Sequence, residues 1–235
     1  MYIILHGPPG AGKGTQSENL CEQFGIKAIA AGDELRAIMK DESSELGTKI
    51  KTYVDAGNLV PDALVMDVIA NRISQPDCAN GFILDGYPRT QPQVEHLQKW
   101  LTAQGKSIQG VFSLNITDEE SMVRCSMRLT CKNPECKKNF HLKYNLPKIA
   151  RRYVNEEDVA TPIFECGKCG TDLYMRSDAD PKKIQTRIDN YHSFTEPIIA
   201  TLSTMGWPVF EIDGMKKPDD VTAEINTVIQ EKFSS

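Results

Sequence analysis

A glycine-rich run near the start of the sequence has the composition of a phosphate-binding loop. Residues 7–15 read Gly-Pro-Pro-Gly-Ala-Gly-Lys-Gly-Thr, which fits the pattern G-x-x-x-x-G-K, although a glycine precedes the threonine. Glycines let backbone N–H groups converge on a phosphate, and the positive end of a following helix adds to the attraction. We therefore expect a nucleoside triphosphate here, with the lysine reaching its β and γ oxygens. The residues predicted to bind it are Gly10, Ala11, Gly12, Lys13, Gly14 and Thr15.

Arginines recur along the chain in segments that could serve the same chemistry. Phosphoryl transfer depends mainly on positioning and on cations that neutralise charge on oxygen atoms. A single arginine is usually a solvated surface charge, so these residues matter only if the fold brings several of them to the loop. The candidates are Arg36, Arg89, Arg124, Arg128, Arg176 and Arg187.

Four of the seven cysteines form two close pairs, Cys131 with Cys136 and Cys166 with Cys169. Two such pairs are typical of a structural Zn²⁺ site, in which four thiolates surround the metal and leave no position for chemistry. Iron and free thiols are the alternatives that the spacing leaves open. The sequence shows no secretory signal, so a metal is favoured over disulfides.

The composition narrows the class of protein. The chain has 235 residues, 40% of them hydrophobic, and a net charge of −5, which argues against a general binder of nucleic acid or of membrane surfaces. The sequence contains no apolar run near the ~18–20 residues that a membrane span needs. We expect a cytoplasmic protein without nucleic-acid or membrane partners.

The pattern of elements predicts a doubly wound parallel α/β sheet, with ligands beyond the carboxyl ends of its strands. Short apolar runs alternate with helical patterns along most of the chain. The expected strands cover residues 2–5, 81–84, 110–115 and 208–212, and the expected helices 13–24, 61–73, 91–104, 118–129 and 219–233. Thr90 is the expected N-cap of the third helix.

Two stretches break this alternation. Residues 32–57 hold two short helical patterns, at 33–40 and 45–56, and predict a small helical insert. Residues 129–176 carry polar turns and the paired cysteines, and predict a β-rich insert held by a metal. The pairs are 29 residues apart, and residues 150–162 look like an extended loop within that segment.

Taken together, these segments resemble the adenylate kinase family in its long-lid form. The phosphate loop, Gly32–Arg36, Leu84–Gln93, Arg176–Asp178 and Arg187–Tyr191 follow one another as in that family and cover nearly the whole chain. The resemblance implies a core (1–29, 61–127 and 178–235), an insert that binds the nucleoside monophosphate (30–60) and a lid (128–177). It implies a monomeric enzyme that transfers a phosphoryl group from Mg-ATP to AMP, giving two ADP, with Mg²⁺ as cofactor and no general base.

The resemblance also implies roles for individual residues. Arg36 and Arg89 would hold the α-phosphate of the acceptor, Gln93 would bind its base, and Gly86 would let the chain approach it. Arg124 would stack on the donor adenine, and Asp85 would orient Mg²⁺-bound water. Lys13, Arg89, Arg128, Arg176 and Arg187 would surround the transferred group, with Phe140 and His141 at the donor nucleoside and Ala31, Asn58, Leu59, Val60, Arg176 and Arg187 at the acceptor.

One departure concerns the choice of acceptor. Family members specific for AMP carry Ser-Thr where this chain has Ala30-Ala31, and an alanine at the second position is similar to the related UMP/CMP kinases. Those relatives lack the long lid and differ at Thr90 and Gln93, so we expect AMP, with a relaxed or CMP/UMP preference as the alternative. An inactive nucleotide-binding protein with a zinc module would be expected to have lost the cations, which are all present.

Overall fold

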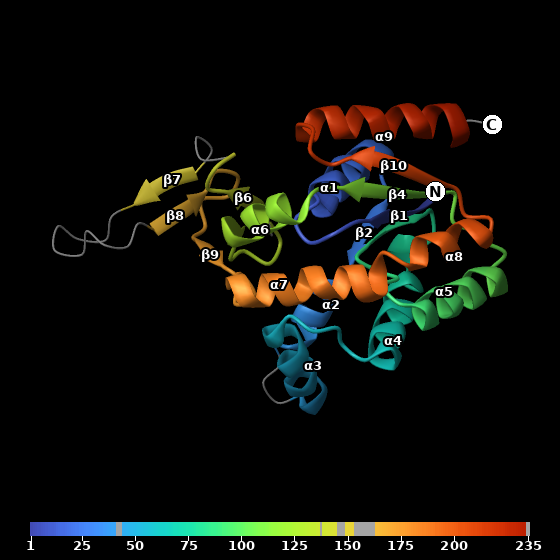
Figure 1. Ribbon diagram of the computed structural model, residues 1–235, viewed down its shortest axis with the longest axis horizontal. Coiled ribbons are helices and arrows are strands. Elements are labelled where there is room, and N and C mark those ends of the chain that lie inside the picture. Colours follow the sequence, from blue (N-terminus) through green and yellow to red (C-terminus); the bar gives the residue numbers. More distant parts are fainter. Residues whose placement is uncertain (41–43, 137, 145–148, 153–162, 234–235) are drawn as a thin grey trace.

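The structure is a computed structural model that describes residues 1–40, 44–136, 138–144, 149–152 and 163–233 (Figure 1). Five strands form a parallel sheet in the order β10-β4-β1-β3-β2. This arrangement confirms the predicted α/β fold. The strands are β1 (Tyr2–His6), β2 (Lys27–Ala30), β3 (Phe82–Asp85), β4 (Gly110–Asn115) and β10 (Val209–Asp213).

Helices cover both faces of the sheet (Figure 1). Because successive side chains of a strand point to opposite faces, Ile3 and Leu5 of β1 pack in one apolar cluster and Ile4 packs in the other. The first cluster includes residues of α1 (Lys13–Phe24) and α9 (Pro218–Phe233). The second includes residues of α4 (Asp62–Ile73), α5 (Gln91–Ala103) and α8 (Ile198–Thr204).

The carboxyl ends of the central strands gather the chemistry at one edge of the sheet. The chain leaves β1 into the glycine-rich loop and leaves β3 at Asp85–Gly86. After β3 it passes over β1 to reach β4, so the strand order changes direction at this point. Ligands of doubly wound sheets bind at such a crevice.

The helical insert consists of α2 (Ala31–Ile38) and α3 (Glu45–Ala56). Ser44 caps α3 by accepting a hydrogen bond from the backbone N–H of Gly47, and Gly57 ends it. The insert is tied to α7 (Pro181–Asn190), because the Asn190 side chain donates to the Gly57 carbonyl at 3.2 Å.

The β-rich insert follows α6 (Asp118–Ser126). Its strands β5 (Arg128–Cys131), β6 (Asn139–His141) and β9 (Leu173–Met175) form an antiparallel sheet, and β7 (Ile149–Arg152) pairs with β8 (Ile163–Cys166). A small apolar cluster, including Leu129 and Leu173, lies inside. Residues 153–162, which make up most of the predicted extended loop, lie outside the described residues.

Several elements differ from the sequence expectation. The helix predicted to reach residue 129 ends at Ser126, because Leu129 is instead buried in the β-rich insert. The edge strand β2 was not predicted, and neither was the pair of helices α7 and α8, which a π-helical turn (Tyr191–Thr195) joins. A short 3₁₀ helix (Pro76–Cys78) precedes β3.

Within the described ranges, every helix is too short or too polar to cross a membrane.

Candidate active site

The glycine-rich loop joins β1 to α1 in a conformation that requires glycine. Gly7 has φ +138°, and a Cβ added there would lie 2.4 Å from the Leu114 carbonyl oxygen of the neighbouring strand. At the other end of the loop, Gly12 is the left-handed N-cap of α1. The loop therefore closes tightly over the end of the sheet and places the positive end of α1 behind it.

Lys13 folds back over this loop. Its Nζ donates to the carbonyl oxygens of Gly7 at 2.7 Å and Pro8 at 2.9 Å. Burial lowers the pKa of Lys13 to about 8, although the nearby Asp85 opposes this shift. Burial raises the pKa of Asp85, and a Cβ on Gly14 would lie 3.6 Å from its Oδ2. Lys13, at the start of α1, and Asp85, at the end of β3, thus both lie beside the glycine-rich loop.

The loop is also fixed against α6. The Ser121 hydroxyl donates to the Pro9 carbonyl at 2.6 Å. Arg124 Nη1 donates to the Gly214 carbonyl at 2.9 Å, and its Nε donates to Glu120 Oε1 at 2.7 Å. Arg124 therefore lies beside the loop with its guanidinium held on two sides.

Five of the predicted arginines, Arg36, Arg89, Arg128, Arg176 and Arg187, lie close enough to affect one another. Burial, and then Arg187, lower the pKa of Arg89 to about 10. Burial, and then Arg36 and Arg128, lower the pKa of Arg176 to about 9. The pKa of Arg128 is lowered as well, by burial and by Arg187 and Arg36. Four of these arginines, Arg36, Arg89, Arg176 and Arg187, line one pocket, so the site is suited to a ligand with several negative charges.

Asp178 is a carboxylate that joins two arginines of this cluster. Its Oδ2 lies 2.6 Å from Arg176 Nη2 and 3.1 Å from Arg187 Nη1. Burial opposes ionisation, but Arg176 and Arg187 outweigh it and lower the pKa of Asp178. The carboxylate holds these two guanidinium groups side by side.

A pocket beside the cluster opens between the helical insert and the core. It is partly open to solvent. Gly86, with φ +69°, lines it next to Arg89, whose Nε donates to the Gly86 carbonyl at 2.8 Å. All the predicted acceptor residues line this pocket: Ala31, Arg36, Asn58, Leu59, Val60, Gly86, Arg89, Gln93, Arg176 and Arg187.

Phe140 and His141, which were predicted to contact the donor nucleoside, lie in different surroundings. Phe140 is 4% exposed and packs in the interior of the β-rich insert. His141 lies at the face of the insert toward α6, with Nε2 3.3 Å from the Val123 carbonyl oxygen and its ring stacked on Tyr144. The Tyr144 hydroxyl donates to Glu120 Oε1 at 2.8 Å. His141 thus approaches Arg124, whereas the Phe140 side chain is buried inside the insert.

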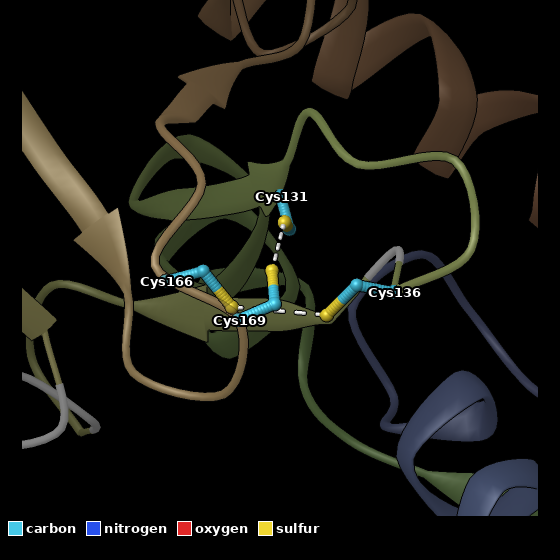
Figure 2. Close-up of side chains that lie close together, drawn as sticks. All are labelled: Cys131, Cys136, Cys166 and Cys169. Atoms are coloured by element: carbon cyan, nitrogen blue, oxygen red, sulfur yellow. Dashed lines mark hydrogen bonds between the residues drawn. The ribbon is translucent and has the colours of Figure 1, made fainter.

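The four paired cysteines meet at one end of the β-rich insert, with their side chains pointing toward one another (Figure 2). The sulfur atoms of Cys131 and Cys169 are 3.4 Å apart, and those of Cys136 and Cys166 are 3.7 Å apart. A tetrahedron of thiolates with metal–sulfur bonds of about 2.3 Å has edges of roughly 3.8 Å. A disulfide would need about 2.05 Å, so the spacing suits a metal.

Asp62 and Glu120 were missed by reasoning from the sequence. Asp62 holds the Gln93 amide, and Glu120 holds Arg124. Glu120 precedes Arg124 by four residues on one helix, a spacing at which acidic and basic side chains meet, so a signal for it was available. Asp62 precedes Gln93 by 31 residues, and its contact depends on the packing of two helices.

Comparisons with known proteins agree with one another. A family model described as adenylate kinase matches residues 5–207. An adenylate kinase of Carboxydothermus hydrogenoformans is 40% identical over 98% of this chain and all of that protein. One of Methanosarcina barkeri is 41% identical over the full length of both. One of Lachnospira eligens is 40% identical over 97% of this chain and all of that protein.

Proposed function

Because the chain belongs to the adenylate kinase family, we propose a division of labour among its residues in moving a phosphoryl group from Mg-ATP to AMP. The observation that carries the proposal is one pocket lined by arginines from different parts of the chain, Arg36, Arg89, Arg176 and Arg187. The enzyme is a phosphotransferase, and the residue roles below are our assignments.

The donor triphosphate binds in the loop. Backbone N–H groups of residues 10–15 and the Lys13 ammonium hold its β and γ oxygens, and Arg124 stacks on the adenine. His141 approaches from the β-rich insert. Asp85 is a half-buried carboxylate beside Gly14, which suits the oxygen-rich surroundings that Mg²⁺ prefers. When bound with ATP, Mg²⁺ supplies charge neutralisation between the phosphates.

The acceptor monophosphate binds in the pocket between the helical insert and the core. Arg36 and Arg89 hold its α-phosphate, and Gln93 contacts its base. The nucleophile is already a phosphate oxygen, so the side chains need not remove a proton. Arg128, Arg176 and Arg187 neutralise the charge that builds up on the transferred group.

The two inserts give the enzyme a means of excluding water. We assign residues 30–60 as the monophosphate-binding unit, residues 128–177 as the lid, and residues 1–29, 61–127 and 178–235 as the core. Closure of both inserts aligns the reacting oxygens and keeps water from hydrolysing ATP. The resemblance further leads us to propose that the protein is a cytoplasmic monomer. Light scattering at micromolar concentration tests the oligomeric state.

The acceptor preference is the part of this assignment that needs a direct test. Initial rates should be measured with Mg-ATP and, separately, AMP, CMP, UMP and GMP. We expect AMP to give the highest kcat/KM, because Gln93 lines the pocket. Equal rates with CMP or UMP would favour the alternative of a relaxed pocket, for which Ala31 is the specific reason: it lines the same pocket and carries no hydroxyl.

We further propose that the four cysteines bind one structural Zn²⁺. The ion would hold together an insert whose apolar cluster is small. Metal analysis should find about one zinc per chain, and removal by a chelator should lower Tm. Cys166→Ser should lose the metal, whereas Cys21→Ser, on α1, should keep it. A metal-free protein with an unchanged Tm would contradict the proposal, and iron in place of zinc would correct the identity of the metal.

A further inference from the structure

The side-chain amide of Gln93 is held between two partners of opposite character. Its Nε2 donates to Asp62 Oδ1 at 2.7 Å, and its Oε1 accepts from the backbone N–H of Arg89 at 2.8 Å. Gln93 is 2% exposed and lines the acceptor pocket. The amide is therefore anchored on both atoms where it meets the pocket.

These partners allow the amide one orientation. An ionised carboxylate has no hydrogen to donate, and a peptide N–H has no lone pair to accept with. Turning the amide over would set the Gln93 N–H groups against the Arg89 N–H, and its oxygen against the Asp62 carboxylate. Both original hydrogen bonds would be lost in a buried position, where an unpaired polar group is costly.

Asp62 is itself held in place. It is the first residue of α4, at the end of the helix where a carboxylate is favoured. The Thr90 hydroxyl donates to the same oxygen, Oδ1, at 2.8 Å, and it caps α5 by accepting from the Gln93 backbone N–H. One carboxylate oxygen thus joins the start of α4, the cap of α5 and the Gln93 amide.

The anchored amide has one N–H and one lone pair left over. A base that pairs with both must offer an amino hydrogen beside an unprotonated ring nitrogen. Adenine and cytosine have this edge. Uracil, guanine and hypoxanthine have the reverse edge, a carbonyl beside a ring N–H, and they would set donor against donor and acceptor against acceptor.

We propose that Asp62 is a positioning residue that determines specificity. By fixing the orientation of the Gln93 amide, it makes the enzyme accept bases with an amino group beside a ring nitrogen and reject bases with a carbonyl beside a ring N–H. The inference rests on the proposed function, in which Gln93 contacts the acceptor base. It also separates the two pyrimidine acceptors: CMP should be used better than UMP.

The sharpest test compares AMP with IMP. The two purines have nearly the same size, but their edges offer opposite hydrogen bonds. We expect the wild-type kcat/KM for AMP to exceed that for IMP by at least about tenfold, because a mismatched edge leaves buried polar groups unpaired. The same assay with CMP and UMP should place CMP first.

Variants then test Asp62 itself. Asp62→Ala removes the carboxylate, so we expect the AMP-to-IMP ratio to fall by about tenfold, with the KM for ATP unchanged. Asp62→Asn retains an oxygen that can accept from Gln93 and Thr90, and should keep most of the ratio. Asp67→Ala removes an exposed carboxylate from the same helix and should leave the ratio unchanged.

The outcomes separate this inference from the function on which it rests. Failure to phosphorylate AMP would contradict the proposed function. Efficient use of AMP with a wild-type AMP-to-IMP ratio near one would overturn the role of the amide edge alone, even if a variant failed to fold. A parallel loss for AMP and IMP in Asp62→Ala, at an unchanged ratio, would reduce Asp62 to a structural residue.

Discussion

The ammonium group of Lys13 illustrates how a single side chain is prepared for its ligand. It rests on the carbonyl oxygens of Gly7 and Pro8, and burial lowers its pKa to about 8. A triphosphate would replace these neutral carbonyl partners with charged oxygens, so the hydrogen bonds of Lys13 would become stronger when the ligand binds. Charged partners form the stronger hydrogen bonds.

Removing this ammonium should greatly slow turnover without unfolding the protein. For Lys13→Ala we expect kcat to fall by about 10²- to 10³-fold, the effect of deleting one group that stabilises developing charge. Steady-state kinetics and a melting curve check the two parts of the prediction. Lys99→Ala, exposed on α5, is the control. Normal turnover in Lys13→Ala would refute the role of the loop.

His6 is a buried side chain that couples stability to pH. It lies at the end of β1, 3% exposed, and its Nε2 is 3.0 Å from the Thr195 carbonyl oxygen. Burial lowers the pKa of His6 to about 4. The unfolded chain therefore takes up a proton near pH 6.5, whereas the folded protein does so only near pH 4.

The free energy of unfolding should consequently fall as the pH drops from 6.5 toward 4. The shift corresponds to a loss of about 3 kcal/mol, all of it present above pH 6.5. Urea titrations across this range measure it, and His6→Gln should show a flatter dependence. His192→Gln is the matched control. Glu196 and then Asp118 raise the pKa of the exposed His192, opposite to the shift of His6, so this substitution should not flatten the dependence. Identical slopes for wild type and His6→Gln would contradict the assignment.

At the scale of elements, one ion-pair cluster connects the β-rich insert to the core. Glu18 on α1 faces two lysines of the insert, with Oε1 3.0 Å from Lys138 Nζ and 3.6 Å from Lys168 Nζ. Lys138 follows Cys136 by two residues, and Lys168 stands between Cys166 and Cys169. The cysteine cluster therefore positions both lysines, and its loss should loosen this connection.

We expect Glu18→Gln to raise the KM for ATP by less than about fivefold, since exposed ion pairs contribute about 0.2–1 kcal/mol. The difference from wild type should be largest at low ionic strength and should disappear in about 0.5 M salt, where exposed charges are screened. Initial rates at both salt concentrations check this. Glu22→Gln, one turn further along α1, is the control, and a salt-independent effect of Glu18→Gln would exclude the ion pairs as its cause.

Reasoning from the sequence found the elements whose own residues specify them. The strand at residues 110–115, the helices at 13–24 and 45–56 and the cap at Thr90 are confirmed. β2 was missed because Lys-Ala-Ile-Ala holds one large apolar residue, and its strand conformation depends on pairing with β3. The predicted helix 118–129 was too long because the residues beyond Ser126 keep a helical spacing, while pairing with β6 and β9 makes a strand of 128–131.

At the active site too, the contacts that depend on tertiary packing were not predicted from the sequence. The loop and the arginines were visible as residue types at given spacings, whereas the partner that orients Gln93 depends on the packing of α4 against α5. Asp62 and Gln93 meet across two helix N-termini. Contacts of this kind are set by tertiary packing, and a single sequence carries no local signal for them.

At the scale of the whole molecule, the positive charges gathered in the site repel one another and destabilise the protein when no ligand is bound. Arg89 and Arg187 come from the core, Arg36 from the helical insert, and Arg128 and Arg176 from the ends of the β-rich insert. Burial and mutual repulsion lower the pKa of Arg89, Arg128 and Arg176. A polyanion should therefore stabilise the protein by relieving this repulsion.

Arg128→Met should make the ligand-free protein more stable and weaken its binding of a polyanion. We expect Tm without ligand to rise by about 2–4 °C, the change that ~1 kcal/mol gives for a chain of this size. The increase in Tm caused by inorganic tripolyphosphate should become smaller, because one of its cations is gone. Differential scanning calorimetry measures both, with Lys132→Met as the control in the same insert. A lower Tm with an undiminished effect of tripolyphosphate would contradict the prediction.

The position of β1 in the sheet also has a consequence for how the protein is made. This strand is synthesised before the other strands of its sheet, yet it lies at the centre, between β3 and β4, and its partners begin at residues 82 and 110. A nascent chain thus carries an apolar strand with both edges unpaired until β3 has been made, and with one edge unpaired until β4 follows. Unpaired strand edges invite association with other chains. Chaperones that bind short apolar segments would therefore act on residues 2–6 before the sheet is complete.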